Sequence, residues 1–304
     1  MGKKEEKKMK LIAITNQKGG VGKTTTSTSI AKGLADKGHK VLIIDADQQA
    51  NATDIVANIG NNIEEEFLDK LLQNTEDQAF KDMNEDEKMH QFMVSLNGCL
   101  YKDYQIKYTL TDVFKDDGQH IKDYIMKTDV DNLDIIPSSL DLGRTKIELI
   151  LQQMTGGTIN KLKQALEPIK DEYDYVIVDC PPDQNLIIAS VIYASDLVLI
   201  PLKSDKGSLK GFLHTYKYML DIEKKNNLHL NFKFLFSIFD NNKVNKKLYQ
   251  VFKAYAGEYI LNSYVRYRGK PASQASMNNQ YLIDSKLNVG YDSKKLVDEI
   301  ERNI

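Results

Sequence analysis

The stretch KLIAITNQKGGVGKTT, residues 10–25, joins an apolar run to a glycine-rich loop that ends in Gly-Lys-Thr. The run KLIAIT (10–15) predicts a short buried strand. A helical pattern follows in TTTSTSIAKGLADKG (24–38), and KVLIID (40–45) predicts a second buried strand. Strand, loop, helix and strand in this order make a βαβ unit, which requires a parallel sheet.

Four further apolar runs have the same buried-strand pattern, namely LDIIP (133–137), YDYVIVDCPP (173–182), DLVLIPL (196–202) and FKFLFSIFD (232–240). Helical patterns separate or follow them at 158–171, 184–194, 206–226, 244–256 and 294–304. This alternation favours an α/β fold with a single doubly wound, mostly parallel sheet and helices on both faces. We expect residues 1–304 to form one domain.

Residues 61–106 interrupt the alternation, because they are acidic, rich in Asn, Met and Gln, and lack strand-like runs. We expect a helical acidic insert within the domain. Charge is also uneven on a larger scale. Residues 61–136 hold 18 Asp and Glu against 8 Lys, whereas residues 203–270 hold 14 Lys and Arg against 5 Asp and Glu. The two regions are either ordinary solvated faces or, for the basic one, the mark of an anionic partner.

The composition is that of a soluble globular protein, with 41% hydrophobic and 28% charged residues in a chain of 304. No apolar run reaches the roughly 18 residues that a membrane span needs. The nearest run, residues 186–202, is interrupted by Ser190, Ser195 and Asp196. Two cysteines are too few for a disulfide scaffold, so we expect a cytoplasmic protein.

The glycine loop is typical of a phosphate-binding site. Glycines at 19, 20 and 22 let the backbone wrap closely around an anion, and the helix N-terminus then faces the phosphates. Lys23 is expected to reach the β- and γ-phosphates, and the Thr24 hydroxyl to hold Mg²⁺. The alternative is a tight strand–helix turn with no ligand. The predicted nucleotide-binding loop comprises Gly19, Gly20, Val21, Gly22, Lys23, Thr24 and Thr25.

Three carboxylates follow predicted strands. Asp45 and Asp47 end the second strand two residues apart, so both leave the sheet edge on the same side, near the phosphates. Asp179 ends the run VIVD and suits a carboxylate that holds a magnesium-bound water. Each acid alone could instead cap a helix, but the three sites together indicate a P-loop ATPase domain.

The base of the nucleotide is less clearly specified. Guanine-binding proteins use Asn-Lys-x-Asp after a late strand, whereas NNKVN (241–245) has Asn245 at the position of that Asp. We therefore favour ATP, and Asn241 or Asn242 could contact the adenine.

The motifs KGGVGKTT (18–25), DADQQAN (45–51) and DCPP (179–182), in this order, resemble those of the deviant Walker box ATPases, and most of all the ParA/Soj partition ATPases. The similarity covers residues 10–57 and 107–202. One departure is Gln48, where the family usually has proline. Long plasmid members carry an N-terminal DNA-binding extension, which we do not expect here because the first strand begins at residue 10.

The resemblance implies a role for an additional lysine. In this family, a lysine at the position of Lys18 reaches across a dimer to the nucleotide of the other subunit, much as an arginine finger does. Together with Lys23 it would neutralise phosphate charge, and Asp47 would position the attacking water. Asp45 would lie near Mg²⁺, and Asp179 would hold the ion through water and sense the γ-phosphate. The resemblance thus predicts a homodimer that forms when ATP is bound.

The basic half of the chain is the candidate DNA-binding region. Partition ATPases bind double-stranded DNA without sequence preference through basic residues of this C-terminal region. A ParB-like centromere-binding partner stimulates their hydrolysis, so the resemblance implies a nucleoid-associated protein. The cargo could be a plasmid, a chromosome, a mobile element or a protein cluster. The candidate DNA-binding residues are Lys243, Lys246, Lys247, Arg266, Arg268 and Lys270.

Other classes share these motifs. A MinD-like membrane-cycling ATPase needs a basic, apolar C-terminal helix, but residues 291–304 hold three basic and four acidic residues, so we expect no membrane partner. Metabolic enzymes of the same fold, such as dethiobiotin synthetase or a cobyrinate amidase, need no cross-subunit lysine. Nitrogenase iron protein uses two cysteines per subunit, but Cys99 and Cys180 show no cluster pattern. The acidic insert could shield the nucleotide site, contact the partner or repel a wrong approach of DNA.

Overall fold

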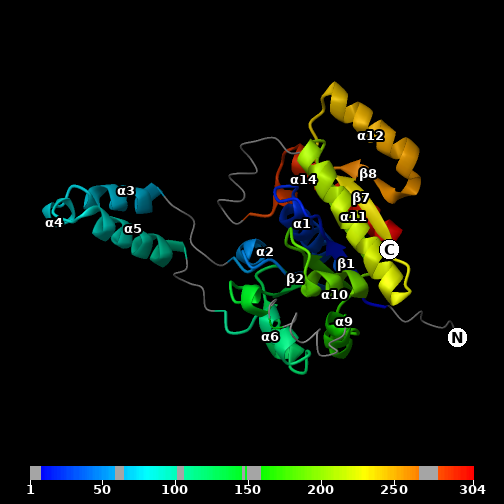
Figure 1. Ribbon diagram of the computed structural model, residues 1–304, viewed down its shortest axis with the longest axis horizontal. Coiled ribbons are helices and arrows are strands. Elements are labelled where there is room, and N and C mark those ends of the chain that lie inside the picture. Colours follow the sequence, from blue (N-terminus) through cyan, green and yellow to red (C-terminus); the bar gives the residue numbers. More distant parts are fainter. Residues whose placement is uncertain (1–7, 59–64, 101–105, 146–147, 149–158, 267–279) are drawn as a thin grey trace.

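A central parallel sheet organises the molecule (Figure 1). The computed structural model describes residues 8–58, 65–100, 106–145, 148, 159–266 and 280–304. Within these residues the sheet has eight strands in the order β3-β4-β2-β5-β1-β6-β7-β8. The strands are β1 (Lys10–Ile14), β2 (Val41–Asp45), β3 (Met126–Lys127), β4 (Leu133–Ile136), β5 (Tyr175–Asp179), β6 (Leu197–Leu202), β7 (Phe232–Phe236) and β8 (Ile260–Tyr264).

Helices connect the strands and cover both faces of the sheet. The α-helices are α1 (Lys23–Asp36), α2 (Asn51–Val56), α3 (Glu65–Asn74), α4 (Gln78–Lys81), α5 (Glu85–Leu100), α6 (Leu110–Lys115), α7 (Ile121–Tyr124), α9 (Lys161–Leu166), α10 (Leu186–Ala194), α11 (Lys206–Asn226), α12 (Lys243–Ala256) and α14 (Asn288–Asn303). Short 3₁₀ turns are η1 (Glu167–Ile169), η2 (Gly257–Tyr259) and η3 (Leu282–Asp284).

The strand register brings the carboxyl ends of the central strands to one edge. β1 pairs in parallel with β5 and β6, and β2 pairs in parallel with β4 and β5. Only β3 runs antiparallel among the paired strands of the described chain. Ligands of open α/β sheets bind outside the carboxyl ends of the strands, where the chain connections diverge to either side. Here that point lies beside β1.

Two apolar cores lie on opposite faces of the sheet. Alternate side chains of β1 separate between them, because Leu11 and Ala13 join one core while Ile12 and Ile14 join the other. The first core packs against α6, α9, α10 and α11, and the second against α1, α14 and η3. Both faces of the central strands β1, β2, β4, β5 and β6 are therefore buried, which explains why their sequences are mostly apolar.

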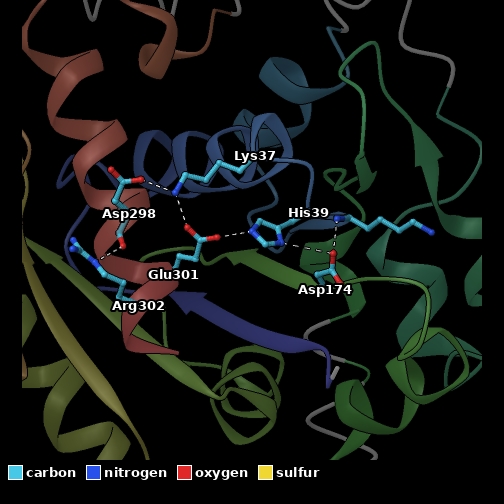
Figure 2. A network of polar contacts seen from close by, with 7 residues as sticks. Lys37, His39, Asp174, Asp298, Glu301 and Arg302 are labelled. Atoms are coloured by element: carbon cyan, nitrogen blue, oxygen red, sulfur yellow. Dashed lines mark hydrogen bonds and ion pairs between the residues drawn. The ribbon is translucent and has the colours of Figure 1, made fainter. Parts of the chain in front are cut away.

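Helix α14 is fixed to the amino edge of the sheet by a polar network (Figure 2). Lys37 Nζ contacts Asp298 and Glu301 at 2.6 Å each, and His39 Nε2 lies 2.7 Å from the other oxygen of Glu301. On the other side of its ring, His39 faces Asp174, which immediately precedes β5. The network lies at the opposite end of the strands from the glycine loop.

The helices α3, α4 and α5 project from the sheet domain as a separate arm (Figure 1, cyan). Residues 65–100 are helical apart from two short turns, and no side chain described between residues 67 and 97 is buried. The expected ends of the insert, 61–64 and 101–105, fall outside the described residues. None of the helices in the described part of the chain is long and apolar enough to cross a membrane.

The expected fold class is confirmed, with two strands added. β3 has only two residues, and β8 reads ILNSY, whose polar members lack the pattern of a buried strand. β8 is an edge strand, and α14 satisfies its open side, because Glu299 accepts hydrogen bonds from the backbone N–H groups of Asn262 and Ser263 at 2.7 Å each. A strand stabilised in this way depends on contacts with a distant helix rather than on its own apolar period.

Candidate nucleotide-binding site

The loop between β1 and α1 has the backbone conformation that its glycines allow. Gly20 and Gly22 have φ angles of +69° and +79°, which is the left-handed region that other residues rarely adopt. Gly22 is the N-cap of α1, and no side chain caps the helix. The first N–H groups of α1 therefore lack a side-chain acceptor and can bind an anion.

Lys23 lies in this loop with its side chain almost buried. Its Nζ donates to the carbonyl of Lys18 at 3.2 Å. Burial lowers the pKa of Lys23, although the charge of Asp179 opposes this shift. A buried ammonium group that is incompletely compensated in this way suits a bound phosphate.

Asp45 and Asp179 lie side by side at the carboxyl ends of β2 and β5, where they are register partners. Both are buried, and burial raises the pKa of each carboxyl. For Asp45 the neighbouring charge of Asp179 raises the pKa further. Two adjacent buried carboxyl groups are the arrangement that a divalent cation would stabilise in its ionised form.

The two carboxylates differ in their hydrogen bonds. Asp45 accepts from the backbone N–H and the hydroxyl of Thr53 at 2.8 Å, and from the backbone N–H of Asp47 at 3.0 Å. Asp179 accepts from the hydroxyl of Ser27 at 2.7 Å through Oδ1, while its buried Oδ2 has no partner. Asp45 thus holds the loop that carries Asp47, and Asp179 is the carboxylate with an oxygen left for Mg²⁺ or its water.

A cleft of about 410 Å³ opens over the glycine loop. Asp47 lines it, as do Thr24 and Thr25 of the predicted loop. Val21 instead is buried, and its carbonyl accepts from the Ser237 hydroxyl at 2.6 Å, so Val21 anchors the loop to the end of β7. The cleft is also lined by residues that the motifs do not include, namely Thr28, Asn51, Asp54, Ile55, Pro182, Gln280 and Leu282.

Asp54 is the most notable of these additional residues. It lies on α2, and burial raises the pKa of Asp54 to about 6. Its position one turn into the helix after the DADQQAN motif is the only sequence signal for it. Ser27 had a clearer signal, because it follows Lys23 by one helical turn and so faces the same side of α1.

Lys18 lies at the exposed rim of the loop and does not line the cleft of its own chain in the described structure. The loop rests on α11, where Gln17 N–H donates to the hydroxyl of Thr215 at 3.0 Å. A β-carbon added to Gly211 would lie 2.7 Å from Lys18 Cβ, and one added to Gly207 would lie 3.3 Å from Lys18 Cε. Glycines on two successive turns of α11 therefore let the Lys18 side chain lie against the helix.

The structure separates the basic candidates. Lys243, Lys246 and Lys247 are exposed on the first turns of α12. Arg266 instead forms a bidentate ion pair with the buried carboxylate of Asp292, through Nε and Nη2 at 2.7 Å each. Arg268 and Lys270 lie outside the described residues.

The two asparagines considered for adenine contact are exposed and do not line the cleft in the described chain. The side chain of Asn242 accepts from the backbone N–H of Asn245 at 2.9 Å and so caps α12. Cys180 is buried directly behind Asp179, and burial raises the pKa of its thiol well above the ordinary value. An inert core cysteine fits this position better than a cluster ligand.

A glycine loop with a buried lysine, set at the carboxyl edge of a doubly wound sheet beside two strand-end carboxylates, defines a P-loop nucleotide-binding protein. Comparisons with known proteins agree. Residues 9–232 match the AAA domain family. The chain is 35% identical over 222 residues to the sporulation initiation inhibitor protein Soj of Bacillus subtilis, which covers 73% of this chain and 68% of Soj. The chain belongs to the ParA/Soj family of partition ATPases.

Other relatives match over a smaller part of their own length. The chromosome partitioning protein ParA of Caulobacter vibrioides is 31% identical over 205 residues, which is 67% of this chain and 59% of that ParA. ParA of Myxococcus xanthus is 29% identical over 216 residues, or 71% of this chain and 59% of its own length. The chain thus spans about three fifths of these ParA proteins.

Solved structures show the same fold at low identity. A plasmid partition protein of Borrelia burgdorferi bound to AMPPNP has a TM-score of 0.68 at 23% identity, covering 97% of this chain and all of that one. An ATP complex of Cyanothece McdA has a TM-score of 0.70 at 21% identity, covering 97% and 96%. Cobyrinic acid a,c-diamide synthase of Mycobacterium smegmatis, solved with an ATP analogue and magnesium, also has this fold, with a TM-score of 0.66 at 20% identity over 97% of this chain and 95% of its own. The fold alone therefore does not separate partition proteins from metabolic enzymes.

Proposed function

We propose that this chain is a ParA-type ATPase whose ATP-bound homodimer binds non-specific double-stranded DNA and is released when ATP is hydrolysed. The observation that carries the proposal is the separation of the two loop lysines. Lys23 is buried in its own phosphate loop, whereas Lys18 lies exposed at the rim, supported by α11. A second copy facing this rim would place Lys18 where a partner's nucleotide could be reached.

The residues of the site fit ATP and Mg²⁺. The loop glycines, the uncapped start of α1 and Lys23 would hold the phosphates. Thr24 and Asp179 would hold the metal, with Asp45 behind them, and the ion would supply charge neutralisation at the phosphates. Asp47 lines the cleft and is fixed through its backbone by Asp45, so it is the residue placed to orient the attacking water.

Within the proposed dimer, Lys18 of each chain adds positive charge to the other chain's nucleotide. That contribution is largest while the γ-phosphate is present, because the terminal group carries much of the negative charge. Dimerisation therefore depends on the state of the nucleotide, and hydrolysis limits the lifetime of the pair. We assign stimulation of hydrolysis to a ParB-like partner, and a nucleoid location to the ATP form.

DNA binding is assigned to the α12 lysines, with Arg268 and Lys270, which lie outside the described residues, as further candidates from the sequence. Arg266 is held in its ion pair with Asp292, so we assign it to supporting this region rather than to contacting DNA by itself. A single set of three exposed lysines binds a duplex weakly, but two sets in a dimer act together through their high effective concentration. DNA binding would thereby follow ATP-dependent dimerisation.

A DNA mobility-shift assay with ATP, AMPPNP or ADP tests the proposal. We expect binding of duplexes of unrelated sequence with ATP and AMPPNP, little with ADP, and a steep loss of affinity as salt rises. The double change Lys246→Glu and Lys247→Glu should remove most binding, because two cations that face phosphates become anions. Any residual binding should have a salt slope that is smaller by about 0.9 for each lost phosphate contact. The matched control Lys163→Glu with Lys170→Glu, on the distant α9 region, retains it. Equal DNA binding with all three nucleotides would refute the switch.

A further inference from the structure

The arm formed by α3, α4 and α5, hereafter the hairpin, exposes an apolar surface. Six large apolar side chains are exposed on it, namely Leu68, Leu72, Met89, Phe92, Met93 and Val94. Leu72 is 65% exposed, although a leucine of an isolated helix pair would normally be covered by its neighbour. Exposed apolar patches of this kind mark surfaces that another molecule covers.

The sheet domain of the same chain does not cover the hairpin. Figure 1 shows the hairpin projecting to one side of the sheet domain, and no described side chain between residues 67 and 97 is buried. The hairpin is also acidic, with nine Asp and Glu against three Lys over residues 65–100. A molecule that covers it should therefore be both apolar and basic.

Helix α12 has that chemistry. No residue of α12 is buried, and its sequence KVNKKLYQVFKAYA contains four lysines and no acidic residue. Val244 is 72% exposed and Tyr255 is 91% exposed, and Val251 lies between them at a helical spacing of seven and four residues. DNA phosphates would satisfy the lysines of this surface but would leave its apolar stripe uncovered.

We propose that the hairpin of one chain docks on α12 of a second copy. The apolar residues of the hairpin would cover Val244, Val251 and Tyr255, while its acidic residues would face Lys243, Lys246 and Lys247. The hairpin and α12 lie on opposite sides of the sheet domain, so the contact joins two chains rather than folding one chain on itself (Figure 1). Because the hairpin and α12 are different surfaces, the contact is heterologous. Each chain carries one hairpin and one α12 that can take part in it.

Docking occupies the lysines to which the proposed function assigns DNA, and the following consequence rests on that function. A docked hairpin would exclude DNA from α12. The acidic insert would therefore keep DNA-free chains in a self-associated form that cannot bind DNA. The self-association itself does not depend on the DNA assignment, and it needs no nucleotide.

A charge-swap experiment by sedimentation velocity, with the full-length chain without nucleotide at low salt, tests the docking. The hairpin variant carries Asp69→Lys, Glu76→Lys and Asp86→Lys, all at exposed positions, and the α12 variant carries Lys243→Glu, Lys246→Glu and Lys247→Glu. We expect the unchanged chain to associate as its concentration rises. Each variant alone should associate on the order of 100-fold more weakly, since juxtaposed like charges cost several kcal/mol.

An equimolar mixture of the two variants should restore association, because the unchanged acidic hairpin of the α12 variant can still dock on the unchanged basic α12 of the hairpin variant. A mixture that stays monomeric, or an unchanged chain that is monomeric at every concentration, would overturn the docking. Circular dichroism spectra that match the unchanged chain establish that the variants remain folded.

The uncharged double change Leu72→Ser with Met93→Ser separates this inference from the proposed function. It alters no charge, so any change in DNA affinity reports lost competition from the hairpin. With ATP, we expect severalfold tighter DNA binding, whereas unchanged affinity would contradict the competition. If the unchanged chain shows no ATP-dependent DNA binding at all, the proposed function fails, and the charge swap still decides whether the hairpin docks.

Discussion

Lys23 and Asp179 bring opposite charges to the buried carboxyl edge of the sheet, yet burial outweighs their attraction in both. The pKa of Lys23 is lowered and the pKa of Asp179 is raised, and desolvation by burial is the largest cause of both shifts. Both side chains are therefore shifted toward their neutral forms. A triphosphate beside Lys23 and a divalent cation beside Asp179 would reverse both shifts, so the site is electrostatically complete only with its ligands.

Asp54 makes a prediction about pH. Its pKa of about 6 in the folded chain lies above the ordinary 3.8, so its contribution to stability is present below the lower value and is lost as pH rises through about 6. Asp54→Asn should therefore raise the melting temperature at pH about 8 and change it little below about pH 4. Thermal unfolding at both pH values measures this, with exposed Asp86→Asn as the control. An equal shift at both pH values would show that Asp54 is not held in a desolvated position.

At the scale of elements, α11 supports the nucleotide loop through a row of small residues. Gly207, Gly211 and Thr215 lie on successive turns and contact residues 16–18. An alanine β-carbon at Gly211 would lie 3.0 Å from Lys18 N and 2.7 Å from Asn16 Oδ1. Since Asn16 is buried and its amide donates to Pro201 O at 2.7 Å, it has little freedom to move away.

Gly211→Ala should therefore displace the start of the loop. We expect ATP-dependent dimerisation to weaken on the order of tenfold, the equivalent of about 1.4 kcal/mol. Gly207→Ala provides the matched change and should cost less, because its added carbon meets only side-chain atoms at longer distances, the nearest being Asp205 Oδ1 at 3.2 Å and Lys18 Cε at 3.3 Å. Alanine is the better helix former at both positions. Equal dimerisation by both variants would exclude a positioning role for α11.

The network on α14 gives a second prediction for an element. Hydrogen bonds from Lys37 and then from His39 lower the pKa of Glu301 (Figure 2). A lowered pKa contributes stability that is present above about pH 4.5 and is lost as pH falls through the folded value. Glu301→Gln should destabilise the chain near neutral pH, by roughly 1 kcal/mol or less because the pair is partly exposed.

Urea unfolding across this pH range checks the α14 prediction. The difference between Glu301→Gln and the unchanged chain should shrink as the solution becomes more acidic. Glu258→Gln, at an exposed position on η2, provides the control. A difference that stays constant with pH would mean that Glu301 acts by packing rather than by charge.

The sequence predicts the buried strands and the phosphate loop well, because both depend on local pattern. Ile12 and Ile14 are apolar wherever they pack, and Gly22 needs its φ angle whatever surrounds it. It does not predict contacts between distant segments. Lys18 packs against Gly211, and Arg266 pairs with Asp292, although the two residues of each contact are far apart in the chain. No local sequence pattern indicates either contact.

On the scale of the whole molecule, the acidic and basic regions lie on different elements. The acidic hairpin projects from one side of the sheet, and the basic α12 lies on another. In the proposed cycle, ATP joins the nucleotide faces and leaves α12 for DNA, whereas DNA-free chains use the hairpin to cover α12. The roles assigned to Lys18 and to the hairpin are independent, so each can fail without the other.

The most direct test of the central claim is the mass in solution of the chain with AMPPNP, measured by light scattering with and without Lys18→Ala. The Leu72→Ser and Met93→Ser changes are kept in both proteins so that hairpin docking does not contribute. We expect the parent protein, which keeps Lys18, to double its mass from 34.6 kDa with AMPPNP and not with ADP. Lys18→Ala should stay at the monomer mass while binding the nucleotide with similar affinity. A Lys18→Ala protein that dimerises as readily as its parent would contradict the claim that this lysine joins the two nucleotide sites.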